Sequence, residues 1–288
     1  MTVITLWGTR GSIAAPGPET EHYGGNTSCI QITGREGTAL ILDAGTGLRR
    51  LGRTLAPGIR RVDILLTHLH MDHLQGLGFF GVLRNPEIEV HIWGPASTTL
   101  NLRARLTRYL SPPFFPVMLR DLPRMPLLHE VPCPEFDVGE FHVHTSLVNH
   151  PGPTVGFRIE CGEGVVAYLP DHEPALGVRH FPLGQDWTSG YAVARDADLL
   201  IHDTQYTSVE YAEREGWGHS SVTHTLAFAQ LVDARRLITF HHDPDHSDAD
   251  LERITAEALD EAGSACPVTI GAEGDQFELG AGVMKDEG

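Results

Sequence analysis

The chain has 288 residues and 41% of them are hydrophobic, so it is long enough to bury a sizeable core. Its formal net charge of −17 counts against a protein that grips nucleic acid mainly through phosphate contacts. The cysteines are far apart and form no Cys-x-x-Cys pair, which favours a reducing compartment (Cys29, Cys133, Cys161 and Cys266). No segment reaches transmembrane length, so we expect a cytoplasmic protein without membrane contact.

Apolar runs bounded by glycine alternate with helical patterns along the chain. Strands are predicted at residues 3–7, 29–33, 39–43, 62–66, 89–93, 141–147, 154–160, 165–169, 199–202 and 237–240. Helices are predicted at residues 48–55, 73–83, 97–109, 209–215, 221–231 and 248–262. So many strands mixed with helices indicate an α/β fold in which two packed sheets are covered by helices. We expect a single domain over residues 1–288.

Prolines interrupt this pattern between residues 111 and 134. Because proline removes backbone donors, we expect a long excursion there and no core element. The paired Phe114 and Phe115 suggest an apolar platform for a base or another ring. Two other readings stay open: the loop folds back onto its own domain, or it completes the site of a neighbouring subunit.

The strongest motif places three imidazoles and one carboxylate within the segment from His68 to His73, directly after an apolar run. His68 and His70 are alternate residues of a strand end, so they point the same way and are able to chelate one ion. Asp72 and His73 follow the turn and are directed at a second ion. Imidazole nitrogen and carboxylate oxygen suit zinc and its neighbours, so the segment predicts a metal site.

Three more candidate ligands each lie just beyond a predicted strand: His150, Asp171 and His241. Each one alone is explained as well by a helix cap or by a hydrogen-bonded core histidine. Their shared position at strand ends places them at the same rim as the first cluster. Because His242 directly follows His241, either histidine could be the last ligand. Its position at the strand end favours His241.

The order of these residues resembles the metallo-β-lactamase fold superfamily of dinuclear metallohydrolases, with Asp43 after a strand ahead of the histidine motif. The resemblance implies a four-layer αββα sandwich with two divalent ions, zinc or manganese. It assigns His68, His70 and His150 to one ion, Asp72, His73 and His241 to the other, and Asp171 to both. Asp43 is expected either to support the ligand loop or to cap the following helix.

Further motifs resemble the phosphodiesterase branch of that superfamily. The turns at residues 8–12 and 26–28 are similar to the N-terminal turns of these enzymes. The run Leu199–Asp203 followed by the pair His219-Ser220 resembles the segments that supply a catalytic histidine and its acidic partner. The resemblance implies that Asp72 and the metal ions promote attack by water, while His219, oriented by Asp203, acts as general acid. The tRNA enzymes typically carry Glu where this chain has Asp203.

The net charge and the lack of a Lys- or Arg-rich arm favour a small cyclic phosphodiester, such as a cyclic nucleotide, over nucleic acid. Arg10 and Arg158 are expected to hold its phosphate, and Phe114 and Phe115 to stack on it. The alternatives are a tRNA 3′-end processing endoribonuclease, a thioester hydrolase and a non-catalytic nucleotide-binding sensor. Because homodimers are common among the enzymes it resembles, we also expect a homodimer.

Overall fold

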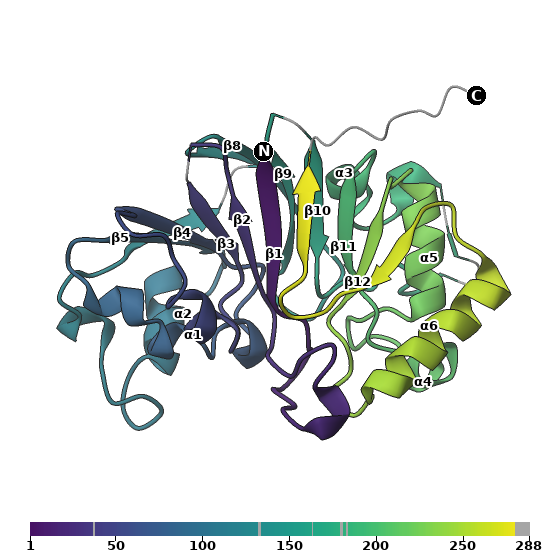
Figure 1. Cartoon of the computed structure of the whole chain (residues 1–288), viewed down its shortest axis with the longest axis horizontal. Coiled ribbons are helices and arrows are strands. Elements are labelled where there is room, and N and C mark those ends of the chain that lie inside the picture. Colours follow the sequence, from purple (N-terminus) through teal and green to yellow (C-terminus); the bar gives the residue numbers. More distant parts are fainter. Residues whose placement is uncertain (37, 132–133, 163, 179–180, 183, 280–288) are drawn as a thin grey trace.

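Two seven-stranded sheets lie face to face, and helices cover the outer face of each (Figure 1). This computed structural model describes residues 1–279 except 37, 132–133, 163, 179–180 and 183. The four layers confirm the αββα sandwich expected from the sequence.

The first sheet has parallel strands in its middle and at one edge, and antiparallel strands at the other edge. Its order is β14 (Gln276–Leu279), β1 (Thr2–Gly8), β2 (Cys29–Thr33), β3 (Ala39–Leu42), β4 (Arg61–Leu65), β5 (Glu89–Pro95) and β6 (Leu127–Val131). Helices α1 (Leu48–Leu51) and α2 (Leu102–Tyr109) pack on its outer face through buried leucines such as Leu48 and Leu106.

The second sheet pairs four parallel strands with an antiparallel meander. Its order is β13 (Val268–Ile270), β12 (Leu237–Phe240), β11 (Leu199–Asp203), β10 (Val165–Leu169), β9 (Val155–Glu160), β8 (Phe141–Leu147) and β7 (Glu135–Val138). The helices of this half are α3 (Tyr191–Ala194), α4 (Ser208–Glu213), α5 (Val222–Leu231) and α6 (Asp248–Ala262). Helix α6 begins at a capping box in which Ser247 and Asp250 bond each other's backbone.

Alternate residues of the strands fill the space between the two sheets. Leu42 of the first sheet and Phe157 and Phe240 of the second are fully buried there, in one apolar cluster. Burying one such side chain contributes about 1.5–3 kcal/mol, so the cluster holds the two sheets in a fixed relation.

The helix predicted over residues 73–83 is wrong, because the segment forms three short 3-10 turns: η2 (Met71–His73), η3 (Leu77–Phe79) and η4 (Gly81–Arg84). A Cβ atom at Gly76 would lie 1.9 Å from the carbonyl oxygen of Gly45. The apolar spacing is typical of a helix, but these glycines allow an irregular backbone to lie directly against the neighbouring loop.

The proline-rich excursion is only partly irregular. It contains a 3-10 turn, η5 (Leu119–Asp121), and then β6, which pairs in parallel with β5 and which the sequence did not predict. Phe115 is buried and contacts Phe79 and Tyr109 edge to face or tilted. The loop therefore folds back onto its own sheet, which is one of the two alternatives given for it above.

The thiols of Cys29 and Cys161 are buried and unpaired, and that of Cys266 is partly exposed. Cys133 lies outside the described residues. Within the described part of the chain, none of the helices combines the length and the apolar character that a membrane crossing requires.

Candidate metal centre

The loops that follow β4, β8, β10 and β12 meet on the side of the stacked sheets where these strands end (Figure 1). These loops carry all seven predicted ligands: His68, His70, Asp72, His73, His150, Asp171 and His241. They form two adjoining sets of donor atoms, which we call the cradle. Within each set the donor atoms lie within 4.8 Å of one another.

The first set consists of His68, His70 and His150. Nδ1 of His70 lies 3.1 Å from Nε2 of His150, and Nε2 of His68 is buried without a hydrogen-bond partner. Burial lowers the pKa of His68 well below its usual value and that of His150 to about 4. Both imidazoles therefore offer a lone pair at neutral pH, which a metal ligand needs.

The second set consists of Asp72, His73, Asp171 and His241, all buried. Nε2 of His241 lies 3.1 Å from Oδ2 of Asp72. Burial alone would raise the pKa of Asp72, but His73 and His241 outweigh it and lower that pKa. Buried charge of this kind is stable only when it is paired or when it coordinates a cation.

Asp171 faces both sets with one oxygen each. Its Oδ1 lies 3.8 Å from Nε2 of His68 and 3.7 Å from Nε2 of His150. Its Oδ2 lies 2.9 Å from Nε2 of His73 and 3.4 Å from Nε2 of His241. One carboxylate between two groups of imidazoles, together with the unpartnered nitrogen of His68, fits a pair of divalent cations.

Asp43 supports the ligand loop from behind. Its carboxylate accepts hydrogen bonds from Nδ1 of His73 (2.8 Å), the backbone N–H of Thr67 (2.8 Å) and the hydroxyl of Tyr168 (2.9 Å). It does not cap α1, because the N-cap of that helix is Gly47. A carboxylate on Nδ1 fixes the ring so that Nε2 is directed at the metal side.

The structure places His241 in the cradle and turns His242 away from it. Nδ1 of His241 lies 3.0 Å from Oε1 of Gln205, whereas Nε2 of His242 donates to the carbonyl oxygen of Gly271. His241 has a φ of 58°, a strained conformation that costs on the order of 1 kcal/mol. A Cβ atom at Gly11 would lie 2.4 Å from the His241 ring, so this position requires glycine.

His150 is oriented by a loop that the sequence did not connect with it. Its Nδ1 donates to the carbonyl oxygen of Gly218 at 2.9 Å. That loop is held by the buried carboxylate of Glu173, which accepts from the backbone N–H groups of Gly216 and Gly218. Glu173 comes two residues after Asp171, which is the only sequence signal for it; Gln205 and Tyr168 give none.

His219 and Asp203 form a hydrogen-bonded pair beside the cradle, with 2.7 Å between Nδ1 and Oδ2. The His219 ring stacks on His241, with centroids 5.0 Å apart. Burial acts to lower the pKa of His219, but the neighbouring carboxylates, chiefly Asp203, outweigh burial and raise it to about 9. The ring therefore holds a proton at neutral pH.

The residues expected to bind substrate are engaged elsewhere. Arg10 is fully buried and donates to the carbonyl oxygens of Gly24, Asp243 and His246, so it links loops within the protein. Arg158, on β9, bonds to Glu160 and to the carbonyl oxygen of Arg195. Phe115 is packed as described above, and Phe114 is 79% exposed on the same loop. The structure brings none of the three engaged side chains to the cradle.

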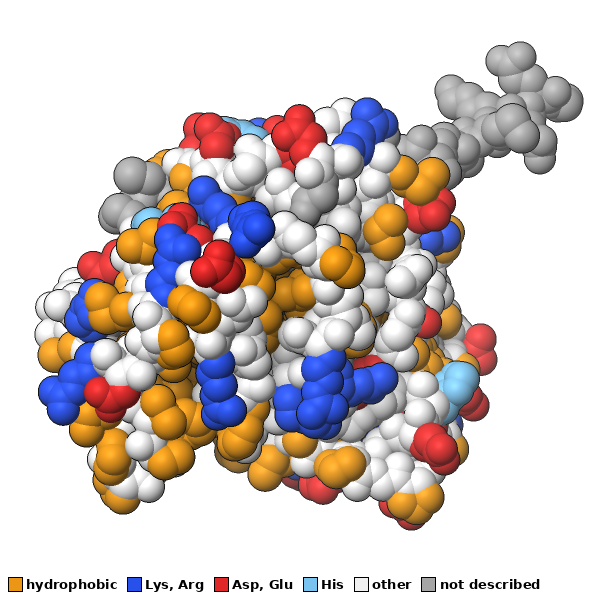
Figure 2. Space-filling view, turned by 60° about the vertical axis from the view of Figure 1, so that its left-hand side comes forward, with side chains coloured by type: hydrophobic (Ala, Val, Ile, Leu, Met, Phe, Trp, Pro, Cys, Tyr) orange, Lys and Arg blue, Asp and Glu red, His pale blue; other side chains and the backbone are white. Residues whose placement is uncertain are grey.

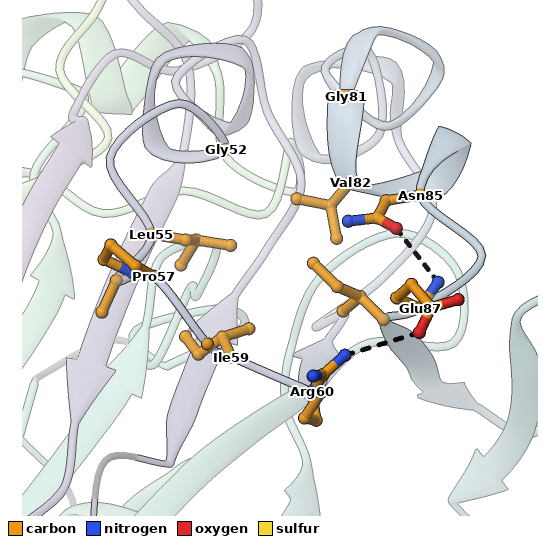
Figure 3. A pocket seen from close by; sticks show the side chains of 12 residues that line it. Gly52, Leu55, Pro57, Ile59, Arg60, Gly81, Val82, Asn85 and Glu87 are labelled. Atoms are coloured by element: carbon orange, nitrogen blue, oxygen red, sulfur yellow. Dashed lines mark hydrogen bonds and ion pairs between the residues drawn. The ribbon is translucent and has the colours of Figure 1, made fainter.

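A cavity of about 500 Å³ lies at the starts of β4 and β5 (Figure 3), whereas the cradle follows the end of β4. Apolar side chains such as Leu55 and Ile59 line it, with an ion pair between Arg60 and Glu87 at its rim. A smaller pocket of about 270 Å³ is lined by His150 together with Glu173 and Gly218. Of these two, the smaller pocket adjoins the predicted ligands.

Two donor sets that share one carboxylate, at the common edge of two stacked sheets, define a class: the dinuclear metallohydrolases of the metallo-β-lactamase fold. Residues 38–242 match the family model described as a Beta-lactamase superfamily domain. The chain belongs to this superfamily, and it is a metal-dependent hydrolase.

The Ribonuclease Z of Gemmatimonas aurantiaca is 27% identical, over 92% of this chain and 93% of that protein. The structure of the short form of human tRNase Z superposes with a TM-score of 0.66 at 21% identity, covering 96% of this chain and 99% of the other. A diphosphatase of the PhnP family superposes with a TM-score of 0.67 at 16% identity, covering 97% and 99%. The two structural likenesses show the same fold.

Proposed function

We propose that this chain hydrolyses RNA phosphodiesters with two divalent metal ions, as a tRNA 3′-end processing endoribonuclease. The observation that carries the proposal is the similarity, over nearly the whole chain, to proteins named Ribonuclease Z. The His219–Asp203 pair beside the cradle supports it, because cleavage of an RNA strand releases an alkoxide that needs a proton. The comparisons favour this alternative over the cyclic nucleotide that the net charge favours.

The net charge hides an uneven distribution of arginine. Residues 49–124 contain eleven arginines and only five acidic residues, although the whole chain carries −17. Five of these arginines are exposed and have no carboxylate partner among the described residues: Arg49, Arg53, Arg84, Arg103 and Arg108. Figure 2, with this half turned forward, shows several basic side chains on its lower part and others above them, with acidic side chains in between. Such a face suits contact with phosphates.

The residues divide the work of holding two ions. His68, His70 and His150 would hold one ion, Asp72, His73 and His241 the other, and Asp171 both. When bound, the ions activate a water molecule and neutralise charge on the phosphoryl oxygens. The nitrogen-rich first set favours zinc, and manganese would also suit the more carboxylate-rich second set.

His219 supplies the proton for the leaving oxygen. Asp203 holds its Nδ1, so the proton available for transfer is on Nε2. Asp203 is itself fixed by the backbone N–H groups of Gln205 and Ser220. The pair is thus positioned before substrate arrives, which a general acid requires.

A second candidate function is hydrolysis of a small phosphodiester. The pocket of about 270 Å³ beside His150 favours it, because it is large enough for a small leaving group and adjoins the first donor set. The diphosphatase of the PhnP family shares the fold, but at 16% identity it says nothing about substrate.

The experiment compares turnover of a tRNA precursor, of purine and pyrimidine cyclic nucleotides and of an activated linear phosphodiester. Zinc- or manganese-loaded protein is used, with Asp72→Ala as control. Cleavage of the precursor at its 3′ end, with little turnover of cyclic nucleotides, is expected. Turnover of cyclic nucleotides alone would overturn the RNA proposal in favour of the small substrate. Bound metal without turnover of any diester would favour a nucleotide-binding sensor.

A further inference from the structure

A second group of histidines and carboxylates lies on the outer face of β7, β8 and β9, in the edge region of the second sheet. His142 and His144 are alternate residues of β8 and so share one face. The register sets Glu135 of β7 opposite His144, and Asp137 opposite His142. The other face of these strands carries core residues such as Val143, so the polar group is turned away from the core.

The donor atoms of this group are already close together. Glu135, His142 and His144 each offer one atom, all within 4.8 Å of one another. Oε1 of Glu135 lies 3.3 Å from Nδ1 of His144, and two zinc ligands at about 2.0 Å from the ion in tetrahedral geometry lie ~3.3 Å apart. The two imidazole rings are 4.5 Å apart and nearly perpendicular.

Asp137 gives the group a further feature of a metal site. Its Oδ1 lies 2.6 Å from Nδ1 of His142, so that nitrogen is the donor, and in the neutral ring Nε2 carries the free lone pair. A carboxylate that accepts from one ring nitrogen orients the other toward a metal and raises its basicity. On β9, Oε1 of Glu160 lies 3.5 Å from Nε2 of His144 and provides another acceptor at the rim.

We propose that Glu135, His142 and His144 bind one zinc ion, oriented through Asp137, at a site separate from the cradle. The competing explanation is that the histidines only form cross-strand ion pairs with the acidic residues. Two imidazoles and one carboxylate with an open position match the donors that zinc prefers. Because β7 is the edge strand of its sheet, a bound ion would tie this edge to β8.

Zinc binding to the whole protein tests the site. The wild-type chain, His142→Ala/His144→Ala and the control His22→Ala, at an exposed histidine elsewhere on the surface, are dialysed against buffered free zinc, and bound zinc is measured by elemental analysis. We expect the double variant to bind one zinc fewer per chain than the wild type and the control. The readout is this difference, so it does not depend on how many ions the cradle holds.

Further measurements separate zinc binding from a structural role of the histidines. Phosphodiesterase activity of the double variant, loaded at low free zinc, is expected to equal that of the wild type. Asp137→Asn is expected to weaken the additional site by roughly 10-fold. Added zinc is expected to raise the Tm of the wild type and not that of the double variant. Equal zinc content in the wild type and the double variant would overturn the proposal.

Discussion

The first sheet supplies four candidate ligands from one loop, His68 to His73, whereas the second sheet supplies His150, Asp171 and His241 from the ends of three strands. The loop places its donors close together through its own local geometry. The separate ligands come together only when β8, β10 and β12 are assembled into the sheet. The comparison shows that one part of the cradle depends on local sequence and the other on the tertiary fold.

The sharpest test compares one aspartate from each half. Asp171→Ala removes the carboxylate that faces both donor sets, whereas Asp72→Ala removes a donor from one set. We expect Asp171→Ala to lose both ions and to reduce turnover by ~10³-fold or more, since metal ions supply several kcal/mol of transition-state stabilisation. Asp72→Ala is expected to retain one ion. Metal content and kcat are measured, and equal metal loss in both variants would contradict the bridging position.

The next largest effect concerns His219, which lies in the loop between α4 and α5 and is not a metal ligand. His219→Ala is expected to reduce kcat by ~10²–10⁴-fold while both ions stay bound, because only the general acid is lost. An activated phosphodiester with a good leaving group serves as internal control. Its leaving group needs little protonation, so kcat on this substrate should fall much less. A variant that keeps full activity on a poor leaving group would remove His219 from this role.

The pH profile of Asp203→Asn examines the same pair. The carboxylate raises the pKa of His219, so the alkaline limb of wild-type kcat is expected above the usual histidine value of 6.5. In the variant this alkaline limb should move toward the usual histidine value of 6.5. The raised pKa also means that the pair stabilises the fold fully below pH 6.5 and loses this contribution as the pH rises through 9. An unchanged alkaline limb in Asp203→Asn would show that Asp203 does not control the pKa of His219.

A smaller effect is expected from Asp43, which supports the ligand loop of the first sheet. Asp43→Asn weakens the support of His73, and loss of such a partner typically costs about 10–100-fold in metal affinity or activity. Tyr168→Phe removes one hydrogen bond to the same carboxylate and serves as the milder comparison. Metal affinity is measured by competition with a chelator. Equal affinity in Asp43→Asn and the wild type would show that the loop holds His73 unaided.

The smallest effect on the chemical step is expected from the exposed arginines of the first half. Replacing Arg49 and Arg53 with Gln should weaken binding of a tRNA precursor, because each removed guanidinium leaves one phosphate of the RNA with its counterions. The slope of log affinity against log salt concentration should become shallower by ~1 for each such phosphate. Turnover of the activated linear diester should be unchanged. An unchanged salt dependence would place the RNA on another face.

Much of the cradle could be predicted from the sequence because each ligand follows a strand or belongs to the histidine motif. Strands such as Phe141–Leu147 and Leu237–Phe240 have clear apolar patterns and were predicted with their observed limits. The edge strands β6, β7, β13 and β14 were not, since short strands at a sheet edge carry little periodicity.

The residues that orient the ligands could not be predicted in the same way. Gln205 and Glu173 act through contacts with residues 36 and 45 positions away in the chain, and no local pattern marks such contacts. The surroundings of Arg10 could not be predicted either, because an arginine in a glycine-rich turn is typical of a phosphate site, and only the fold shows that backbone carbonyls surround it. The net charge gives no sign of the exposed arginines between residues 49 and 124, because it is a sum over the whole chain.

The hydrogen bond from the hydroxyl of Tyr168 on β10 to the carboxylate of Asp43, just after β3, crosses the space between the two sheets. It couples the separation of the sheets to the position of His73. If one sheet slid by a single ångström, His73 and Asp171 would no longer face each other at 2.9 Å. Core substitutions that shift one sheet against the other are therefore expected to disturb the cradle as well as the core.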